Sequence, residues 1–453
     1  MNNINWRDKG FFKAMLAIAL PIALQNLISS SLNMVDTVMI GRLGETEIAA
    51  VGLANQFFFL LILLLFGVNS GAAIFTSQYW GKNDLPNIKR VMGIMLLIGG
   101  GVSLIFATIA FFIPSLILRV FTGDMTVVKL GSSYLKIVSL SYFITAVSFT
   151  YSFTLRSTGQ AKLPMVVSAV SLICNTIINY LLIFGTFGFP KMGVEGAALA
   201  TLISRGVELF LIIIIVYGQK MDIAASLKEM IDIPGSLIKQ YLKTGLPVIL
   251  NEGFWSLGMT MYTVAYARIG TEAIASVQIA YTIQNVFMVV AFGLGNACAV
   301  LLGNAIGARE DERAVDYAIK FSVLGPLVGI ILGIILVVFS DLILSFFNIS
   351  AEVYYNARYI LRIMAFFISF RIFNTILVIG ILRSGGDTTY SLILELCSVW
   401  LFGVPLAFIG AIVLKLPVYW VVALVSCEEA IKACFGIPRV VSKKWLRNVV
   451  DFT

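Results

Sequence analysis

The sequence predicts an all-α integral membrane protein with about twelve transmembrane helices. Its 453 residues are 59% hydrophobic and only 12% charged, with a mean hydropathy of +0.95. Soluble domains carry about a quarter of charged residues, so lipid rather than water is expected to face most of this surface. Apolar runs of about twenty residues or more recur along the chain, the length that spans a bilayer. Because the backbone must satisfy its own hydrogen bonds in lipid, these runs are expected to be helices.

The charges of the loops between the apolar runs predict the topology. Lys and Arg are roughly three times more frequent in one set of loops than in the other, which places both termini in the cytoplasm. The first apolar run continues through Pro21 and Gln25 without a small-residue cleavage site, so we expect it to be retained. The predicted spans lie near residues 15–39, 50–77, 90–116, 131–154, 163–187, 194–218, 241–265, 278–303, 319–340, 357–381, 389–413 and 417–438.

The composition excludes several functional classes. There is no histidine, which removes histidine metal sites, catalytic triads and proton relays. The net charge of +8 fits basic cytoplasmic loops, and no basic run with interleaved aromatics suggests nucleic-acid binding. The five cysteines form no C-x-x-C pair, and no nucleotide-binding or hydrolase motif is present. We therefore expect neither an enzyme nor a primary pump, and no bound cofactor.

An internal repeat organises the chain. Sliding the sequence on itself by about 226 residues aligns short motifs across several spans, as in transporters built from repeats. Six spans per repeat give both halves the same orientation, with a pseudo-symmetry axis along the membrane normal. We predict a six-helix bundle over residues 1–217, a cytoplasmic linker with an amphipathic helix over 218–239, and a second six-helix bundle over 240–453. The aligned motifs are Leu20-Pro21 with Leu246-Pro247, Gly44 with Gly270, Gly81 with Gly307, and Leu155-Arg156-Ser157 with Leu382-Arg383-Ser384.

Three segments resemble multidrug and toxic compound extrusion (MATE) transporters. Val35-Asp36-Thr37-Val38-Met39-Ile40-Gly41 resembles the end of that family's first helix, and Gly380–Thr388 resembles its signature after helix ten. Arg439–Trp445 resembles its exit from helix twelve, so the resemblance runs from about residue 14 to residue 445. It implies a bacterial exporter of cationic or amphipathic compounds in the cytoplasmic membrane, working as a monomer and driven by Na⁺ or H⁺.

Asp36 is the leading candidate for binding the coupling cation. Buried acids are costly in lipid, so an acid within a span is a functional candidate; the alternative is an acid that reaches the outer interface. Asn175 and Asn179, one turn apart, and Thr201 offer the hard oxygen ligands that suit Na⁺, although the asparagines could instead join helices. The resemblance implies the same site. The proton-linked DinF-like branch has Asp where Asn179 stands, and losing that acid removes a proton-sharing pair.

The second half offers a different set of candidates. We expect a site for cationic cargo or a coupling cation at Glu252, an acid near mid-depth, together with its neighbour Asn251 and with Arg371. The alternative is an ion pair with a residue such as Arg371 on another helix. The NorM-like branch has its helix-seven Glu several residues further along and an additional helix-ten Asp. Glu252 therefore matches the helix-seven Glu of that branch only approximately. The helix-ten Asp has no counterpart in Ser369–Asn374, so the set of acids typical of that branch is incomplete here.

Other charged residues and two rival functions remain. Arg205 with Glu208, and Glu428 and Glu429 with Lys432, have helical spacing and are interpreted as intrahelical or interfacial pairs.

One rival function is a flippase for lipid-linked oligosaccharides, which would require a strongly cationic cavity. The other is a membrane sensor or scaffold, which would be indifferent to loss of Asp36 and Glu252.

Overall fold

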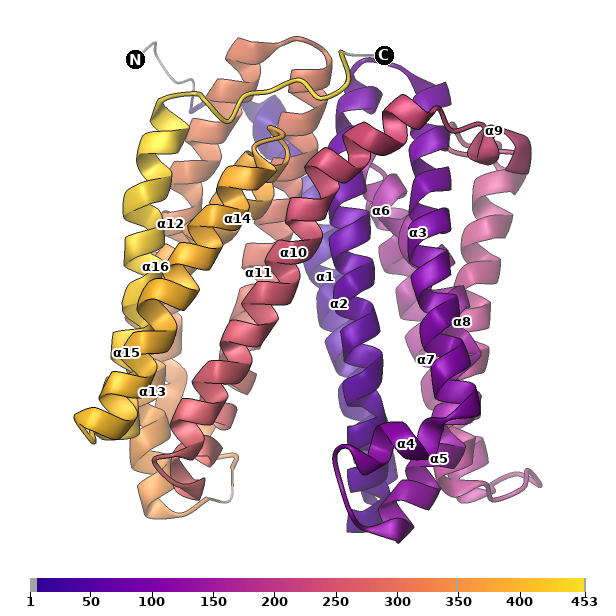
Figure 1. Ribbon diagram of the computed structural model, residues 1–453, viewed down its shortest axis with the longest axis vertical. Coiled ribbons are helices and arrows are strands. Elements are labelled where there is room, and N and C mark those ends of the chain that lie inside the picture. Colours follow the sequence, from indigo (N-terminus) through magenta and orange to yellow (C-terminus); the bar gives the residue numbers. More distant parts are fainter. Residues whose placement is uncertain (1–5, 348, 452–453) are drawn as a thin grey trace. The chain divides into compact units, whose positions relative to one another are not determined.

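The computed structural model describes residues 6–347 and 349–451, apart from the side chain of Asn33. Within these residues the chain is helical throughout and contains no strand (Figure 1). The helices before the linker are α1 (Lys9–Gly41), α2 (Glu45–Gly81), α3 (Leu85–Phe112), α4 (Pro114–Arg119), α5 (Met125–Ser139), α6 (Ser141–Ser157), α7 (Lys162–Phe184) and α8 (Gly193–Gly218). After it come α9 (Leu227–Ile231), α10 (Gly235–Ala267), α11 (Thr271–Gly307), α12 (Asp311–Leu344), α13 (Ala351–Thr375), η1 (Ile376–Arg383), α14 (Thr388–Leu396), η2 (Cys397–Gly403), α15 (Val404–Phe408), η3 (Ile409–Val413) and α16 (Val418–Val441), the η segments being π-helical.

The predicted membrane spans are confirmed as helices. In the described chain nine helices are long and apolar enough to cross a membrane, and α5 with α6 forms a tenth span bent by 46°. The helices α10 and α16 occupy the two remaining predicted positions; α16 carries Glu428, Glu429 and Lys432 within its length. The predicted fold class, an all-α membrane protein, is therefore confirmed.

Helix ends follow local sequence signals. The side chains of Asp84, Asp124 and Ser350 each accept a backbone N–H hydrogen bond at the N-terminus of α3, α5 and α13, and Pro86 occupies the first turn of α3. These caps satisfy N–H groups that have no partner within the helix. Gly185 ends α7 in the left-handed conformation, with φ of 69°, which glycine adopts without steric cost.

The chain divides into two compact units. Unit 1 comprises Met1–Ala23, Ser77–Asn83 and Leu242–Thr453, and unit 2 comprises Leu24–Thr76 and Asp84–Tyr241. Each has its own core of fully buried apolar side chains, such as Leu336 and Leu361 in unit 1 and Leu61 and Leu135 in unit 2. Many large apolar residues elsewhere are exposed, as expected where lipid covers the surface. The division predicted from the repeat, with bundles over residues 1–217 and 240–453, stays a prediction, because the compact units are defined by packing and not by the repeat.

The linker contains less helix than its sequence predicts. Only Leu227–Ile231 is helical between α8 and α10, and α10 already begins at Gly235. A capping box of Ser226 and Glu229 starts this short helix, and Pro234, which cannot donate a backbone hydrogen bond, separates it from α10. The linker packs closely on α3, because a Cβ added to Gly93 would lie 1.9 Å from the Met230 carbonyl oxygen.

A reciprocal contact in unit 1 joins the two repeats. A Cβ added to Gly81 at the end of α2 would lie 1.9 Å from the Asn304 carbonyl oxygen of α11. A Cβ added to Gly307 of α11 would lie 1.8 Å from the Gln78 carbonyl oxygen of α2. The repeat shift of about 226 carries Gly81 onto Gly307 and Gln78 onto Asn304. Each glycine thus allows the same close approach from opposite sides, as expected where equivalent helices cross at a pseudo-two-fold axis.

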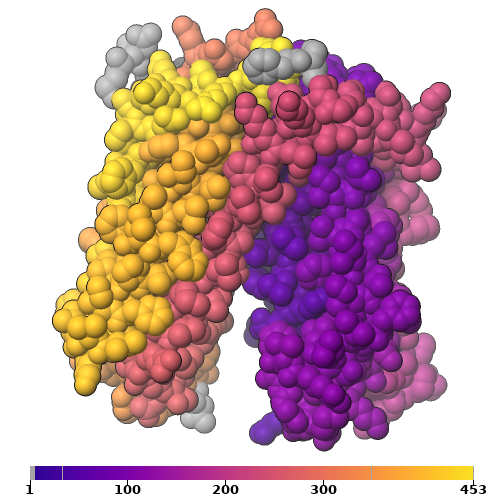
Figure 2. Space-filling model, viewed as in Figure 1, coloured from indigo at the N-terminus to yellow at the C-terminus, as the bar shows by residue number. Residues whose placement is uncertain are grey.

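The C-terminal segment closes one end of unit 1, where it follows α16 (yellow in Figure 2). Trp445 is buried at 1% exposure, and its backbone lies against Gly385. Asp387 ties the segment down through Arg439, at 2.7 Å, and Arg447, at 3.0 Å. The carboxamide oxygen of Gln78 accepts a hydrogen bond from the Val449 N–H at 2.8 Å. The two segments that resemble family signatures, Arg439–Trp445 and Gly380–Thr388, therefore contact each other directly.

Candidate functional site

Asp36 lies in unit 2 near the end of α1, where it is bound by an asparagine. The Asn179 Nδ2 donates a hydrogen bond to Asp36 Oδ1 at 2.5 Å and is 2.9 Å from Asn175 Oδ1. Both asparagines are fully buried. The Asn179 amide oxygen has no hydrogen-bond partner within the described part of the chain. The sequence-predicted residues Asp36, Asn175 and Asn179 therefore lie together, with an unsatisfied oxygen beside a carboxylate.

The asparagines belong to a polar face between α7 and α8. On α7, Ser168, Ser171, Asn175 and Asn179 recur at helical spacing, and the sequence periodicity puts them on one face. On α8 the same holds for Thr201, Ser204, Arg205 and Glu208. Hydrogen bonds join the two helices, among them those from Asn175 Nδ2 to Ser204 Oγ at 3.4 Å and from Ser171 Oγ to the Ser204 carbonyl at 3.0 Å.

Thr201 contributes to the site indirectly. Its hydroxyl donates to the Ala197 carbonyl at 3.0 Å and also interacts with Tyr134 of α5. Tyr134 is buried, lies 3.5 Å from Asn55 Oδ1 and interacts electrostatically with Asp36. Sequence reasoning missed Tyr134, since an aromatic residue in an apolar span gives no signal of a polar contact.

The polar face of α8 extends past the residues that lie near Asp36. Arg205 pairs with Glu208 at 2.8 Å, the intrahelical pair that their spacing predicts. Glu208 accepts a hydrogen bond from Ser168 at 3.3 Å, and Ser168 accepts one from Gln25 at 3.0 Å. Arg156, from the repeated Leu-Arg-Ser motif, donates to Gln25 at 2.6 Å. Asp36 itself has no Lys or Arg within 4.0 Å in the described chain, and Arg205 acts on it from a longer distance.

In unit 1, Glu252 has a cation partner other than the one considered above. Arg383 of η1 contacts Glu252 at 2.7 Å, and the two side chains are 4% and 14% exposed. The neighbouring Asn251 donates to Ser391 of α14 at 3.3 Å. Arg371 instead donates to Gln284 at 2.7 Å and lies 3.6 Å from Glu429. Arg383 belongs to the same repeated motif as Arg156, which was the available signal for this pair.

A cluster of charged residues in unit 1 lies beyond what the sequence predicts. Lys432 of α16 contacts Glu395 of α14 at 2.8 Å and Glu429 at 3.8 Å. Asn374 of α13 donates to Glu429 Oε2 at 2.7 Å. Glu428 accepts a hydrogen bond from the Tyr262 hydroxyl of α10. The pairing of Glu429 with Lys432 was predicted within the helix, but its extension to α13 and α14 was not.

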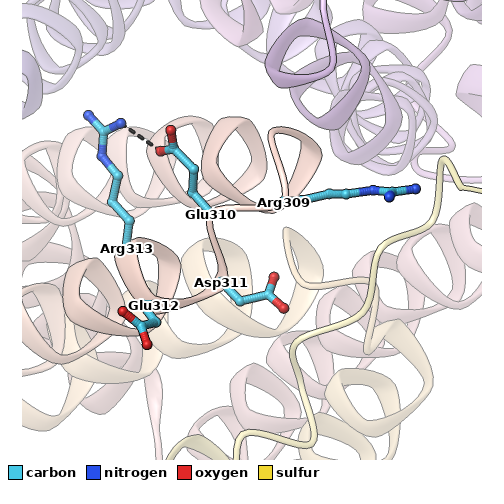
Figure 3. A pocket seen from close by; sticks show the side chains of 5 residues that line it. All are labelled: Arg309, Glu310, Asp311, Glu312 and Arg313. Carbon is cyan, nitrogen blue, oxygen red and sulfur yellow. Dashed lines mark hydrogen bonds and ion pairs between the residues drawn. The ribbon is translucent and has the colours of Figure 1, made fainter.

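Charged residues at the turn before α12 and in its first helical turn line an open surface hollow (Figure 3). Its lining is Arg309, Glu310, Asp311, Glu312 and Arg313. Arg313 pairs with Glu310 at 2.7 Å, while Arg309 extends to Asp451 at 3.1 Å. These exposed ion pairs contribute little to stability.

A known family model matches this chain twice, once in each repeat. Two segments, residues 21–181 and 247–409, match the MatE family model, and they begin at the equivalent Pro21 and Pro247. The probable multidrug resistance protein YoeA of Bacillus subtilis is 27% identical over 441 residues, covering 96% of this chain and 94% of YoeA. The probable multidrug resistance protein NorM of Thermotoga maritima is 25% identical over 403 residues, covering 88% of this chain and 85% of NorM.

The fold is also found among solved structures. An outward-facing multidrug resistance MATE family transporter of the MOP superfamily superposes with a TM-score of 0.84 at 21% identity. The match covers 95% of this chain and 96% of that protein. Together with the family model, which matches more than half of the sequence, these findings identify a transporter rather than an enzyme. The chain belongs to the MatE family of membrane transporters.

Proposed function

We propose that this chain exports cationic or amphipathic organic compounds from bacteria by antiport, with Na⁺ or H⁺ entering in exchange at Asp36. The observation that carries the proposal is the Asp36 site: a carboxylate held by Asn179, with no Lys or Arg within 4.0 Å in the described chain. In a span, such a carboxylate is costly unless it binds a cation or a proton. The names of the relatives YoeA and NorM, probable multidrug resistance proteins, support export of drugs.

The ligand set fits either coupling ion. Na⁺ is a hard cation that binds carboxylate and amide oxygens, and the unpaired Asn179 amide oxygen could serve once the side chain turns. A proton would require only the Asp36 carboxylate. The single acid in this site favours one positive charge at a time. We place the protein in the bacterial plasma membrane with both termini in the cytoplasm, on the strength of the loop charges.

Transport from proteoliposomes tests this function. Purified protein is reconstituted with ethidium inside, and Na⁺ and pH gradients are imposed separately. We expect efflux above protein-free vesicles under at least one gradient. Failure of a broad panel of organic cations to move, combined with movement of a lipid-linked oligosaccharide between leaflets, would favour a flippase instead. Gradient-independent efflux would argue against antiport.

A further inference from the structure

Five charged residues of unit 1 form a buried cluster in which the charges do not balance. We call Glu395, Glu428, Glu429, Lys432 and Arg371 the glutamate cluster. The three glutamates are 7%, 3% and 8% exposed and Lys432 is 4% exposed, whereas the Arg371 side chain is 22% exposed. Three carboxylates therefore face two cations in the interior of a helical bundle. One negative charge is left without compensation, which is costly in a membrane protein.

The distances show which carboxylate carries the excess charge. Lys432 contacts Glu395 at 2.8 Å and Glu429 at 3.8 Å, and Arg371 lies 3.6 Å from Glu429. In the described chain no Lys or Arg comes within 4.0 Å of Glu428, whose hydrogen-bond partner is the Tyr262 hydroxyl. Glu428 is thus the buried acid of the cluster that lacks a direct cation partner.

The surroundings favour a proton over a metal ion at Glu428. A Cβ added to Gly403 would lie 1.9 Å from Tyr262 Oη and 2.4 Å from Glu428 Oε2, so the η2 backbone closes over the pair. In the described residues no three Asp, Glu or Cys side chains converge to hold a metal. A proton needs no added volume. Because a tyrosine hydroxyl both donates and accepts, its hydrogen bond to Glu428 can persist in either protonation state.

A buried amide next to Glu429 is also incompletely hydrogen-bonded. Asn374 is 3% exposed and bonds Glu429 through its amide nitrogen, yet its amide oxygen has no partner within the described part of the chain. Beside the glutamate cluster there is therefore also a buried acceptor without a donor. The charged and titratable groups that act on Glu428 or its hydroxyl partner are Tyr262 and Tyr266 of α10, Tyr281 of α11, Arg371 of α13, Glu395 of α14, and Glu429 and Lys432 of α16.

We propose that Glu428 is a proton-binding site of this transporter, separate from the coupling-ion site at Asp36, and that it takes up and releases one proton in the transport cycle. The role in the cycle rests on the proposed antiport function, whereas proton binding does not. Proton uptake converts the Glu428 carboxylate to the neutral acid. The charges that remain are then balanced, because the two carboxylates of Glu395 and Glu429 face the two cations of Lys432 and Arg371.

Infrared spectroscopy of the reconstituted protein tests proton binding without substrate or gradient. The carbonyl stretch of a buried carboxylic acid should appear and disappear as pH is varied. Glu428→Gln should lose this band, whereas Glu272→Gln, which removes an exposed acid at the start of α11, should retain it. Tyr262→Phe should keep the band but shift it, because the acid loses its hydroxyl partner. An unchanged spectrum in Glu428→Gln would overturn the proposal.

Transport measurements test the role in the cycle. Glu428→Gln should flatten the pH profile of the initial ethidium efflux rate, whereas Glu272→Gln should preserve it. A lost band combined with a wild-type pH profile would overturn the role in transport. If Glu428→Gln fails to fold, Tyr262→Phe replaces it, and an unshifted band in that variant would count against the site. A pH-dependent band in a protein that moves no substrate would contradict the proposed function and leave proton binding at Glu428 intact.

Discussion

The Tyr262 hydroxyl donates a hydrogen bond to the Glu428 carboxylate in unit 1, and Tyr262 stands where the repeat shift places Asp36. In unit 2 the acid lies on α1 and its amide partner on α7. In unit 1 the helix equivalent to α1 supplies a hydroxyl and α16 supplies the acid. The two carboxylates, Asp36 on α1 and Glu428 on α16, therefore lie on helices that the repeat does not make equivalent.

Replacing Asn179 should change how the Asp36 site responds to pH. Asn179→Asp puts a second carboxylate within hydrogen-bond distance of Asp36. Two acids this close cannot both ionise readily, so the pair should share a proton. We expect the initial rate of ethidium efflux at fixed Na⁺ to become more strongly pH-dependent than in the wild type. Asn179→Ala, which removes the polar group without adding an acid, serves as the control. An identical pH profile for Asn179→Asp and wild type would contradict this.

The Glu252–Arg383 pair should matter for stability. Arg383 is buried and Glu252 is half-buried, and removing one partner of an ion pair in such surroundings is destabilising, at a cost of about 3–5 kcal/mol, because the charge–charge attraction is lost while the other charge stays desolvated. Glu252→Gln should therefore lower the midpoint of thermal unfolding in detergent. Combining it with Arg383→Gln should recover much of the loss, since no lone charge remains. A double variant that loses the sum of the two single losses would show that the residues do not act as a pair.

The helix crossing in unit 1 should tolerate no side chain at its glycines. Gly81→Ala or Gly307→Ala would push a methyl group into a backbone carbonyl, which should cost at least about 1–3 kcal/mol. The matched control is Gly101→Ala in α3, where nothing lies within 4 Å of an added Cβ. That change should be neutral or slightly stabilising. Thermal unfolding of purified protein compares the three, and equal midpoints would contradict the close crossing.

The short linker helix should loosen in acid. The hydrogen bond from Lys89, with those from Ser226, lowers the pKa of the Glu229 carboxyl to about 2, from an ordinary value of 4.5. The folded linker binds the proton less readily than the unfolded linker, so this contribution is complete above pH 4.5 and is lost as pH falls toward 2. Glu229→Gln should mimic the acid effect at neutral pH.

Limited proteolysis measures the opening of this linker. Glu229→Gln should speed cleavage near Leu227–Ile231, whereas Glu312→Gln, which removes an exposed acid in the first turn of α12, should leave it unchanged. Cleavage at the wild-type rate in Glu229→Gln would show that the carboxylate does not hold the helix.

The sequence predicted what depends on spacing along one chain. A lone acid in an apolar span identified Asp36, and a four-residue interval placed Asn175 beside Asn179. Composition and the repeat predicted the helical fold. The partner of Glu252 lies 131 residues away, and the choice between Arg383 and Arg371 depends on the rotation and depth of packed helices. The glutamate cluster was missed for the same reason, because Glu428 and Glu429 are adjacent in sequence yet contact different helices.

The measurement closest to the central claim is gradient-driven ethidium efflux from proteoliposomes containing Asp36→Asn. The amide keeps the size of the side chain but cannot carry the negative charge that binds the coupling ion. If Asp36 binds that ion, the variant should fold with a wild-type unfolding midpoint and lose the dependence of efflux on the imposed Na⁺ or pH gradient. Efflux that follows the gradient as it does in the wild type would contradict the claim that coupling passes through Asp36.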